Sequence, residues 1–340
     1  MSESLAIKYR PKTWDDVTEQ NSTKIILQNQ LNTNSVKNAY LFCGPAGCGK
    51  TTCARIFANE INKGQGNPIE LDAASNNGVD DVRNIIQQAK MQSLDSEYKI
   101  FIIDECHALS NSAWQAMLKI IEEPPAKSIF IFCTTDPHKI PKTIISRVQR
   151  YEFQRISHNG IVNRLNHILC KEQLNVVSSQ ESIEYIAKLA DGGMRDAITL
   201  LDKCLSYSKD LTLENVVKAL DVVDYDVMFK LTDSILHRNS ARTLEMIETM
   251  YFSGVDLKQF ISLYMQFVIN ICKYMLDDKL SITIPKTEEN VKHLNSIDNY
   301  DDIIDLLQVL VDLNADIKYS STVRFDIESQ MLLFIARRSE

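Results

Sequence analysis

The sequence lacks any apolar run that could cross a membrane. Its longest candidate, residues 260–276, is interrupted by Gln266, Asn270 and Lys273, whereas a membrane helix needs about 20 predominantly apolar residues. The first residues, MSESLAIKYRPK, contain no apolar core behind a basic start, so we expect no secretory signal peptide. These two absences favour a cytoplasmic protein.

The chain contains eight cysteines, but their spacing in the sequence is not that of a metal site. No two of them form a C-x-x-C pair, which is the spacing typical of a structural zinc site. Several lie in apolar runs, where a reduced thiol behaves as a small hydrophobic group. We therefore expect free cysteines in a reducing compartment, and no zinc.

A positive net charge is lacking as well, since 37 basic and 45 acidic residues give a net charge of −8. Residues 1–220 contain 25 basic and 25 acidic side chains, whereas residues 221–340 contain 12 basic and 20 acidic ones. An acidic total usually argues against a nucleic-acid partner. Here the excess negative charge lies only in the last third of the chain. The first 220 residues, with no net charge, could still bind an anionic ligand.

What the first part of the sequence does contain is an alternation of short apolar runs with helical patterns, typical of a parallel sheet covered on both faces. The expected strands are residues 39–43, 69–73, 99–104, 128–134 and 148–153, and the expected helices are 50–62, 79–91 and 112–123. After residue 153 the strand signal fades. The expected helices there are 159–172, 180–190, 194–206 and 213–220, followed by a helical region that includes a buried segment at 256–279 and an amphipathic one at 300–319.

Residues 44–51, GPAGCGKT, fit the phosphate-binding pattern G-x-x-x-x-G-K-[ST] between an expected strand and an expected helix. Glycines let the backbone wrap phosphates closely, and the loop N–H groups and the helix N-terminus supply positive potential. Lys50 is expected to reach the β- and γ-phosphates, and Thr51 to bind Mg²⁺. A loop that binds nucleotide without hydrolysing it remains the alternative.

The expected strand at 99–104 ends in two adjacent carboxylates, Asp104 and Glu105. Asp104 is expected to hold the Mg²⁺, directly or through water, and Glu105 to polarise the attacking water as general base. His107 completes a D-E-x-H string, but a partly buried structural histidine explains it equally well.

Cys48 lies inside the phosphate loop, at a helix N-terminus. Such an environment lowers the pKa of a thiol. We therefore expect thiol alkylation to inhibit ATP hydrolysis and ATP to protect. A filler residue of tolerated size is the alternative.

In this order, the motifs resemble those of the AAA+ clamp-loader ATPase subunits of DNA replication, and among them the bacterial DNA polymerase III gamma/tau subunits. The likeness covers about residues 5–220 and continues in helical character beyond. The matching segments are residues 8–11 with Trp14, 44–51, 70–75, 104–105, 118–125, 134–137, 146–147 and 193–197. The resemblance implies an α/β AAA+ P-loop domain at 1–156, a helical lid at 157–220 and an all-α collar at 221–340.

The resemblance also implies how an ATP site is composed. Thr135, or its neighbour Thr134, resembles sensor 1, and Arg195 resembles sensor 2, which reaches the γ-phosphate from the lid. Arg147 resembles the arginine finger, which completes the ATP site of the neighbouring subunit in trans. The implied ATP-binding residues are Tyr9, Arg10, Pro11 and Val17 at the adenine, together with Gly44, Pro45, Ala46, Gly47, Cys48, Gly49, Lys50, Thr51, Thr52 and Arg195.

The implied function is ATP hydrolysis in a clamp loader that opens a sliding clamp and loads it onto primer–template DNA. The implied cofactors are ATP and Mg²⁺, and the implied partners are other subunits of a pentameric ring, the clamp and DNA. Arg83 aligns with a helix start that follows the DNA backbone in the family. Met91, Leu94 and Tyr98 lie where such subunits touch the clamp.

Three departures from the bacterial pattern stand out. Residues 59–68 lack the four zinc-binding cysteines of the bacterial subunits, and Val148 stands where a cysteine usually follows the finger. We expect no long C-terminal extension of the tau type, so a role in tethering polymerase or helicase is not carried over. The short form also resembles phage, archaeal and eukaryotic small subunits and leaves a phage origin open.

Other interpretations stay open beside this one. Another AAA+ motor, such as a branch-migration helicase or an initiator, needs a basic winged helix after the lid, which the acidic residues 221–340 do not favour. A tandem-RecA helicase needs a second α/β domain, and the sequence indicates none. A nucleotide-binding scaffold favours degenerate ATP motifs, whereas Lys50, Thr51, Asp104 and Glu105 are all present.

Overall fold

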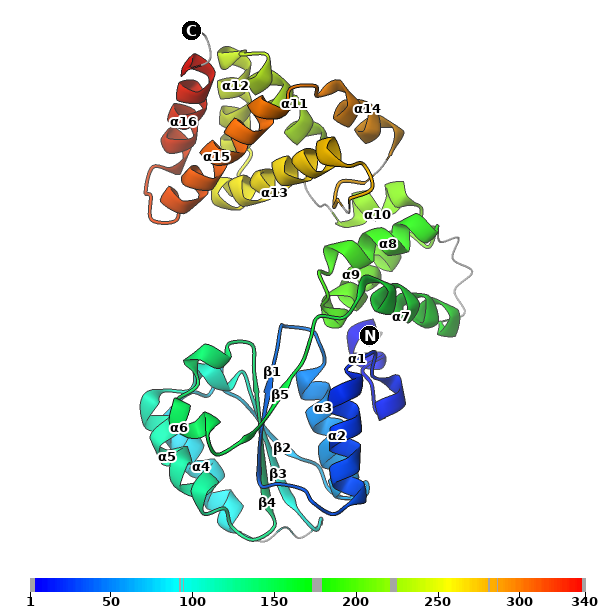
Figure 1. The fold of residues 1–340 in the computed structure, drawn as a ribbon, viewed down its shortest axis with the longest axis vertical. Helices are drawn as coiled ribbons and strands as arrows, with labels where there is room; N and C mark the ends of the chain where they lie inside the picture. Colours follow the sequence, from blue (N-terminus) through cyan, green and yellow to red (C-terminus); the bar gives the residue numbers. More distant parts are fainter. Residues whose placement is uncertain are drawn as a thin grey trace. The chain divides into compact units, whose positions relative to one another are not determined.

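The chain divides by its internal contacts into two compact units, Met1–Val216 and Val217–Glu340, which Figure 1 draws in the colours of the sequence. The first unit contains the expected α/β domain and most of the expected lid. The finer division at residues 156 and 220 stays a prediction. The computed structural model describes residues 4–91, 93, 95–172, 179–220, 225–280, 282–285 and 287–337.

A five-stranded parallel sheet, in the order β2-β3-β4-β1-β5, forms the centre of the first unit. The α/β parallel-sheet prediction is thereby confirmed, and each strand ends within one residue of its expected bounds. The strands are β1 (Ala39–Cys43), β2 (Ile69–Asp72), β3 (Lys99–Asp104), β4 (Ser128–Thr134) and β5 (Gln149–Glu152). Because β1 lies between β4 and β5, its carboxyl end is the point where successive connections leave the sheet in different directions, which is where such sheets bind ligands.

Helices cover both faces of the sheet (Figure 1). Alternate side chains of β1 serve opposite faces: Leu41 and Cys43 belong to the core beneath α4, α5 and α6, and Tyr40 and Phe42 belong to the core beneath α2 and α3. This two-sided burial explains why the central strands β1, β3 and β4 are nearly continuous apolar runs, whereas the edge strands β2 and β5 alternate between more and less buried residues. The helices are α2 (Asn21–Asn32), α3 (Lys50–Ile61), α4 (Val79–Lys90), α5 (Asn111–Glu122) and α6 (Lys142–Ile145).

Several short or weakly patterned elements escape the sequence analysis. The buried face of α2 includes the polar residues Thr23 and Gln30 beside Leu27, so its apolar period is faint. Gln30 is held in place by hydrogen bonds to Tyr40 and Tyr151. The short elements are α1 (Leu5–Lys8), α6, and the 3-10 helices η1 (Trp14–Asp16), η2 (Cys106–Ala108) and η3 (Pro137–Lys139).

The expected helices after residue 153 are present. Gly192 and Gly193 separate α8 from α9, and Gly192 has a positive φ of 83°. The helices are α7 (His158–Lys171), α8 (Gln180–Leu189), α9 (Met194–Tyr207) and α10 (Leu213–Leu220).

The described residues of the second unit form helices around one apolar core. The expected buried segment is α13, in which Tyr264 is 0% exposed and donates to or accepts from Thr232 at 2.8 Å. Leu306 and Leu310 of α15 lie in the same core. The helices are α11 (Tyr225–Leu236), α12 (Ser240–Phe252), α13 (Leu257–Leu276), α14 (Glu288–Ser296), α15 (Tyr300–Asp316) and α16 (Val323–Arg337).

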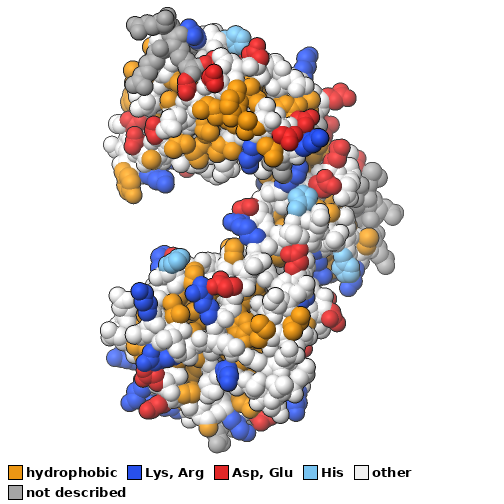
Figure 2. Space-filling model, in the orientation of Figure 1, with side chains coloured by type: hydrophobic (Ala, Val, Ile, Leu, Met, Phe, Trp, Pro, Cys, Tyr) orange, Lys and Arg blue, Asp and Glu red, His pale blue; other side chains and the backbone are white. Residues whose placement is uncertain are grey.

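Hydrophobic side chains gather on the face of the second unit that Figure 2 shows. The large apolar residues exposed in this unit include Phe252, Val311, Tyr319, Phe325 and Leu333. In the part of the chain that the structure describes, no helix is both long and apolar enough to span a membrane.

Candidate nucleotide-binding site

A cavity of about 590 Å³ opens at the carboxyl ends of β1 and β3, between the phosphate loop and α9. Most of the residues predicted to bind ATP line it: Tyr9, Arg10, Pro11, Val17, Ala46, Gly47, Cys48, Gly49, Lys50, Thr51, Thr52, Asp104, Glu105 and Arg195. Gly44 and Pro45 form the start of the same loop without lining the cavity. The sequence-predicted residues therefore converge on one place, although they come from five separate segments.

Glycine is required at two positions of the phosphate loop. Gly44 has a φ of 153°, and a Cβ there would lie only 2.4 Å from the carbonyl oxygen of Phe153. Gly47 has a φ of 69°, which side chains rarely adopt, and its carbonyl oxygen accepts a hydrogen bond of 3.0 Å from the amide of Met194. This bond ties the loop directly to the start of α9.

Lys50 lies inside the loop with only 5% of its surface exposed. Its Nζ donates to the carbonyl oxygens of Gly44 and Pro45, both at 2.8 Å. An ammonium carries three donors, so these two bonds fix the group while leaving a hydrogen for a phosphate oxygen.

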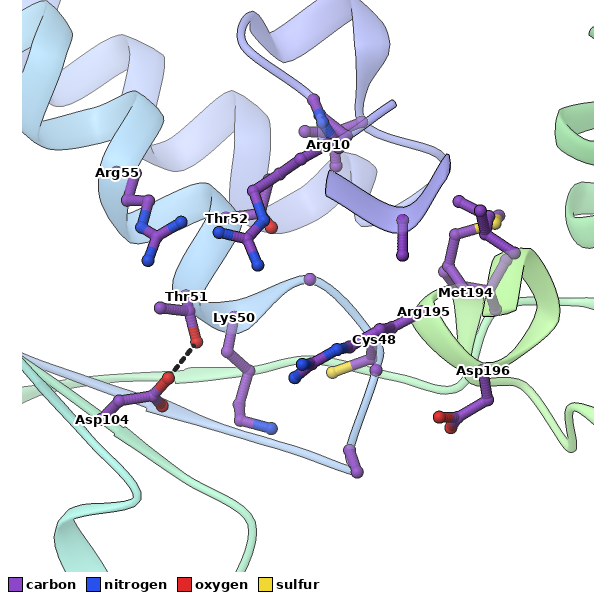
Figure 3. Close-up of a pocket in the computed structure, with 18 of the residues that line it drawn as sticks. Arg10, Cys48, Lys50, Thr51, Thr52, Arg55, Asp104, Met194, Arg195 and Asp196 are labelled. Atoms are coloured by element: carbon purple, nitrogen blue, oxygen red, sulfur yellow. Dashed lines mark hydrogen bonds between the residues drawn. The ribbon is translucent and has the colours of Figure 1, made fainter. Parts of the chain in front are cut away.

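The two predicted Mg²⁺ ligands meet in the structure. The Thr51 hydroxyl donates to Oδ2 of Asp104 at 2.8 Å, as Figure 3 shows. A hydroxyl and a carboxylate are the hard oxygen ligands that Mg²⁺ prefers, usually with waters and substrate phosphates completing its shell. The donor set therefore fits Mg²⁺.

Glu105 follows β3 in the left-handed conformation, with φ 46°. Its Oε2 accepts hydrogen bonds from the hydroxyl of Thr135 at 2.9 Å and from the amide of Thr135 at 3.3 Å. Nδ1 of His107 lies 3.2 Å from the same oxygen and 3.2 Å from Oγ1 of Thr134. His107, which the sequence left ambiguous, thus adjoins the predicted general base, and Thr135 rather than Thr134 contacts it.

The N-terminal segment lines the cavity with Ala6 and residues 9–11. The Tyr9 hydroxyl donates to Oε1 of Glu172 at 2.5 Å, and Nη2 of Arg164 donates to the Tyr9 carbonyl oxygen at 3.0 Å. Burial, with the Glu172 carboxylate beside it, raises the pKa of Tyr9 to about 12. Tyr9 is therefore a neutral hydrogen-bond donor at physiological pH, held by the first helix of the expected lid.

Four charged residues in or near the cavity were not predicted to belong to it: Arg55, Glu70, Arg164 and Glu172. Arg55 makes a two-bond ion pair with Glu70, at 2.7 and 2.6 Å, and both line the cavity. Arg164, which also lines it, and Glu172 are the lid partners of Tyr9. The position of Arg55, one helical turn after Thr51 on α3, was the available signal, since residues four apart share a helix face.

Arg195 points from the start of α9 toward the phosphate loop, with its guanidinium near Lys50 and Cys48 (Figure 3). Its side chain is exposed, and within the described ranges it makes no hydrogen bond or ion pair. The backbone bond between Met194 and Gly47 fixes its starting point. A cation with free donors is thereby aimed at the place where phosphates would lie.

Comparisons with known proteins agree with this geometry. Residues 67–157 match the family model described as "DNA polymerase III, delta subunit", and residues 160–210 match the one described as "DNA polymerase III clamp loader subunit, ATPase lid domain". The chain is 43% identical over 270 residues to the DNA polymerase III subunit tau of Bacillus subtilis, covering 73% of this chain and 48% of that protein. It is 28% identical over 363 residues to the DNA polymerase III subunit gamma of Buchnera aphidicola, covering 98% of each.

Over these segments the chain is similar to the DNA polymerase III gamma/tau clamp-loader subunits. It spans about half the length of tau and gamma/tau relatives such as those of Bacillus subtilis and Mycoplasma genitalium. Among solved structures, RuvB of Thermotoga maritima, titled a Holliday junction branch migration motor, superposes with a TM-score of 0.53 at 20% identity, over 67% of this chain and 79% of that one. That likeness shows the AAA+ fold and nothing further.

The residues that the resemblance to clamp-loader subunits connects with partners lie outside the cavity. Arg147 is exposed, and its Nε donates to Oε1 of Glu122 at 2.7 Å. Arg83 is exposed and pairs with Asp80 at 2.9 Å, one turn away on α4.

The predicted clamp-contact residues differ from one another in the structure. Met91 is 65% exposed, as a surface contact requires. Tyr98 is partly buried, and its backbone amide and carbonyl are both bonded to the side chain of Asn62 at 2.9 Å. Leu94 lies outside the described residues.

The expectation that Cys48 is an activated thiol is wrong. Its side chain is only 1% exposed, and its Sγ donates to the carbonyl oxygen of Pro45 at 3.0 Å. Burial raises the pKa of the Cys48 thiol, and the neighbouring Lys50 ammonium offsets this only in part. Loss of hydration outweighs the helix N-terminus here, so Cys48 fills space in the loop.

We therefore expect iodoacetamide to modify the exposed Cys170 and leave Cys48 intact in the native protein, because alkylation needs an accessible thiolate. Peptide mapping by mass spectrometry after timed labelling measures both sites in one sample, and denatured protein provides the fully labelled reference. Labelling of Cys48 at the rate of Cys170, with loss of ATP binding, would restore the original interpretation.

One group of metal-type ligands lies away from the cavity, among the described residues of the second unit. Donor atoms of Asp226, Glu289 and His293 lie within 4.8 Å of one another. The Asp226 carboxylate already pairs with the ammonium of Lys230, and the His293 ring stacks on Phe229 at 5.0 Å. These contacts account for two of the three side chains, and we assign no metal to the group.

Proposed function

We propose that the chain is an ATPase subunit of a clamp loader, which opens a sliding clamp and loads it onto primer–template DNA. The observation that carries this proposal is the convergence of Lys50, Thr51, Asp104, Glu105 and Arg195 on one cavity in a chain that is similar to clamp-loader subunits. A scaffold that only binds nucleotide would tolerate degenerate ATP motifs, whereas Lys50, Thr51, Asp104 and Glu105 all line this cavity.

The side chains of the cavity supply the functions that phosphoryl transfer requires. Lys50, fixed by Gly44 and Pro45, would bind the β- and γ-phosphates. Thr51 and Asp104 would hold Mg²⁺, which when bound neutralises phosphate charge. Tyr9 and its neighbours would hold the adenine against the first lid helix.

Glu105 is arranged to act as the general base. Its Oε2 is engaged by Thr135 and His107, whereas its Oε1 accepts no hydrogen bond from the described residues. The fixed oxygen orients the carboxylate, and the free one would accept a proton from the attacking water. Through these two hydrogen bonds Thr135 would set the orientation of the Glu105 carboxylate.

Two arginines would act on the γ-phosphate, one in cis and one in trans. Arg195 would reach it from α9 of the same chain, and Arg147, which lies outside this cavity, would reach the ATP of a neighbouring chain. ATP binding would in this way join adjacent subunits, and hydrolysis would release them.

Partners are part of the proposal. We infer a cytoplasmic, pentameric assembly with other loader subunits, in which Arg83 follows the DNA backbone and Met91, Leu94 and Tyr98 contact the clamp. The apolar face of the second unit in Figure 2 supports its role as a collar that packs subunits together, because large exposed apolar patches mark interaction sites. Several neutral first units lining one channel would supply the phosphate contacts that a single one lacks.

Native mass spectrometry of the complex that co-purifies with the tagged chain tests the assembly. We expect a species that contains several copies of the chain or of related subunits, and that gains the clamp when ATP is added. A chain carrying Lys50→Ala is the control and should not recruit the clamp. A monomer with ATP and clamp present would contradict the proposal.

A further inference from the structure

Glu122 ends α5 beside the predicted arginine finger. A carboxylate at the C-terminal end of a helix is unfavourable, because that end carries partial negative charge. Oε1 of Glu122 accepts a hydrogen bond of 2.7 Å from Nε of Arg147, 25 residues further along the chain. The pairing with a guanidinium offsets the cost and explains why an acidic residue is found there.

The remaining contacts of Arg147 fix the plane of its guanidinium. Nη1 donates to the carbonyl oxygen of Thr143 at 2.7 Å and to the hydroxyl of Ser146 at 3.1 Å. With the bond from Nε, three of the five donors of the group are occupied. Both hydrogens of Nη2 remain without a partner among the described residues, and the side chain is 39% exposed.

The two segments that carry this pair are anchored in the same apolar core. α5 packs into the core through Trp114, Met117 and Ile121, which are 2%, 1% and 6% exposed. The turn that carries Arg147 is anchored by Ile144, which is fully buried and whose carbonyl oxygen accepts from the Arg147 amide at 2.9 Å. The Arg147 guanidinium and the Glu122 carboxylate are therefore carried by two segments that are anchored in one core.

We propose that Glu122 is a positioning residue, which holds Arg147 with its Nη2 edge outward so that it can enter the ATP site of a neighbouring subunit. The inference rests on the proposed function, because it needs Arg147 to act in trans. A long arginine without such a brace samples many rotamers, and a displacement of about 1 Å can cost on the order of 100-fold in rate.

The first test compares Glu122→Gln with Glu123→Gln in the assembly reconstituted from full-length chains. Glu123 is the adjacent exposed carboxylate and lies outside the contacts of Arg147, so it matches the charge change. We expect Glu122→Gln to lower kcat about tenfold with little change in KM, and Glu123→Gln to leave both unchanged. Since exposed ion pairs add little stability, the melting temperature should move by less than about 3 °C.

A mixing experiment then locates the effect in the neighbouring site. A Lys50→Ala chain has an intact finger but no functional ATP site, whereas an Arg147→Ala chain has an intact ATP site but no finger. Their mixture should recover activity, because the finger of the first chain can complete the ATP site of the second. Adding Glu122→Gln to the Lys50→Ala chain should lower the recovered rate about tenfold. Adding it to the Arg147→Ala chain should change nothing, which a general structural defect would not reproduce.

The outcomes separate this inference from the proposed function. Full activity of Arg147→Ala, or no recovery on mixing, overturns the finger assignment and this inference with it. A large loss of ATPase rate with Arg147→Ala but a normal rate with Glu122→Gln overturns the inference alone. A raised rate with Glu122→Gln also overturns it, because the ion pair would then restrain the finger. An equal loss with Glu123→Gln overturns it as well.

Discussion

Replacing Glu105 by glutamine is expected to stop ATP hydrolysis while ATP still binds. The amide keeps the size of the side chain and an oxygen that can accept from Thr135, as Oε2 of Glu105 does at 2.9 Å. It cannot take a proton from water, and a positioned general base contributes on the order of 10²–10⁴ in rate. We therefore expect a loss of about 10³-fold in single-turnover hydrolysis, with nucleotide affinity nearly unchanged.

The same variant distinguishes an enzyme from a scaffold. If hydrolysis releases the clamp, Glu105→Gln should accumulate a complex of loader, clamp and primed DNA that wild-type protein forms only briefly. Glu181→Gln, an exposed carboxylate at the first turn of α8, is the matched control. Normal turnover by Glu105→Gln, or complexes as short-lived as those of the wild type, would show that Glu105 is not the base.

Replacing Arg147 by alanine is expected to have the second large effect. An arginine finger is worth about 10³–10⁵ in kcat in other NTPases, and we expect a loss of at least about 10³-fold in the assembly. ATP affinity of the isolated chain should stay the same, because Arg147 does not line its own cavity.

Arg150→Ala is the control for this prediction. Arg150 is three residues away, is also exposed and also pairs with a carboxylate, that of Glu152. Steady-state ATPase of the assembly and equilibrium binding of a fluorescent ATP analogue to the single chain provide the two readouts. A weakened ATP affinity in the isolated Arg147→Ala chain would mean that the arginine acts in cis.

The parts of the fold that the sequence predicts well are those governed by local pattern. The central strands β1, β3 and β4 are nearly continuous apolar runs because both faces of the sheet are covered there. The phosphate loop is predictable because its backbone geometry demands glycine, as the approach of Gly44 to Phe153 illustrates. Asp104 and Thr51 meet because the motifs that carry them end and begin elements at the same edge of the sheet.

What the sequence does not predict depends on contacts between distant segments. Tyr9 and Glu172 are 163 residues apart, and nothing local indicates their hydrogen bond. The pKa of Cys48 was predicted wrongly because its position at a helix N-terminus is visible in the sequence, whereas its burial is a tertiary property. α2 was missed because Gln30 and Thr23 occupy buried positions that usually carry apolar residues.

The central claim is that ATP hydrolysis by this chain is coupled to a clamp and to primed DNA. The most direct measurement is the ATP turnover of the assembly alone, with clamp, with primed DNA, and with both. We predict little turnover by the isolated chain and strong stimulation only when clamp and primed DNA are present together, abolished by Glu105→Gln. Ample turnover by the isolated chain, unaffected by clamp and DNA, would contradict the account.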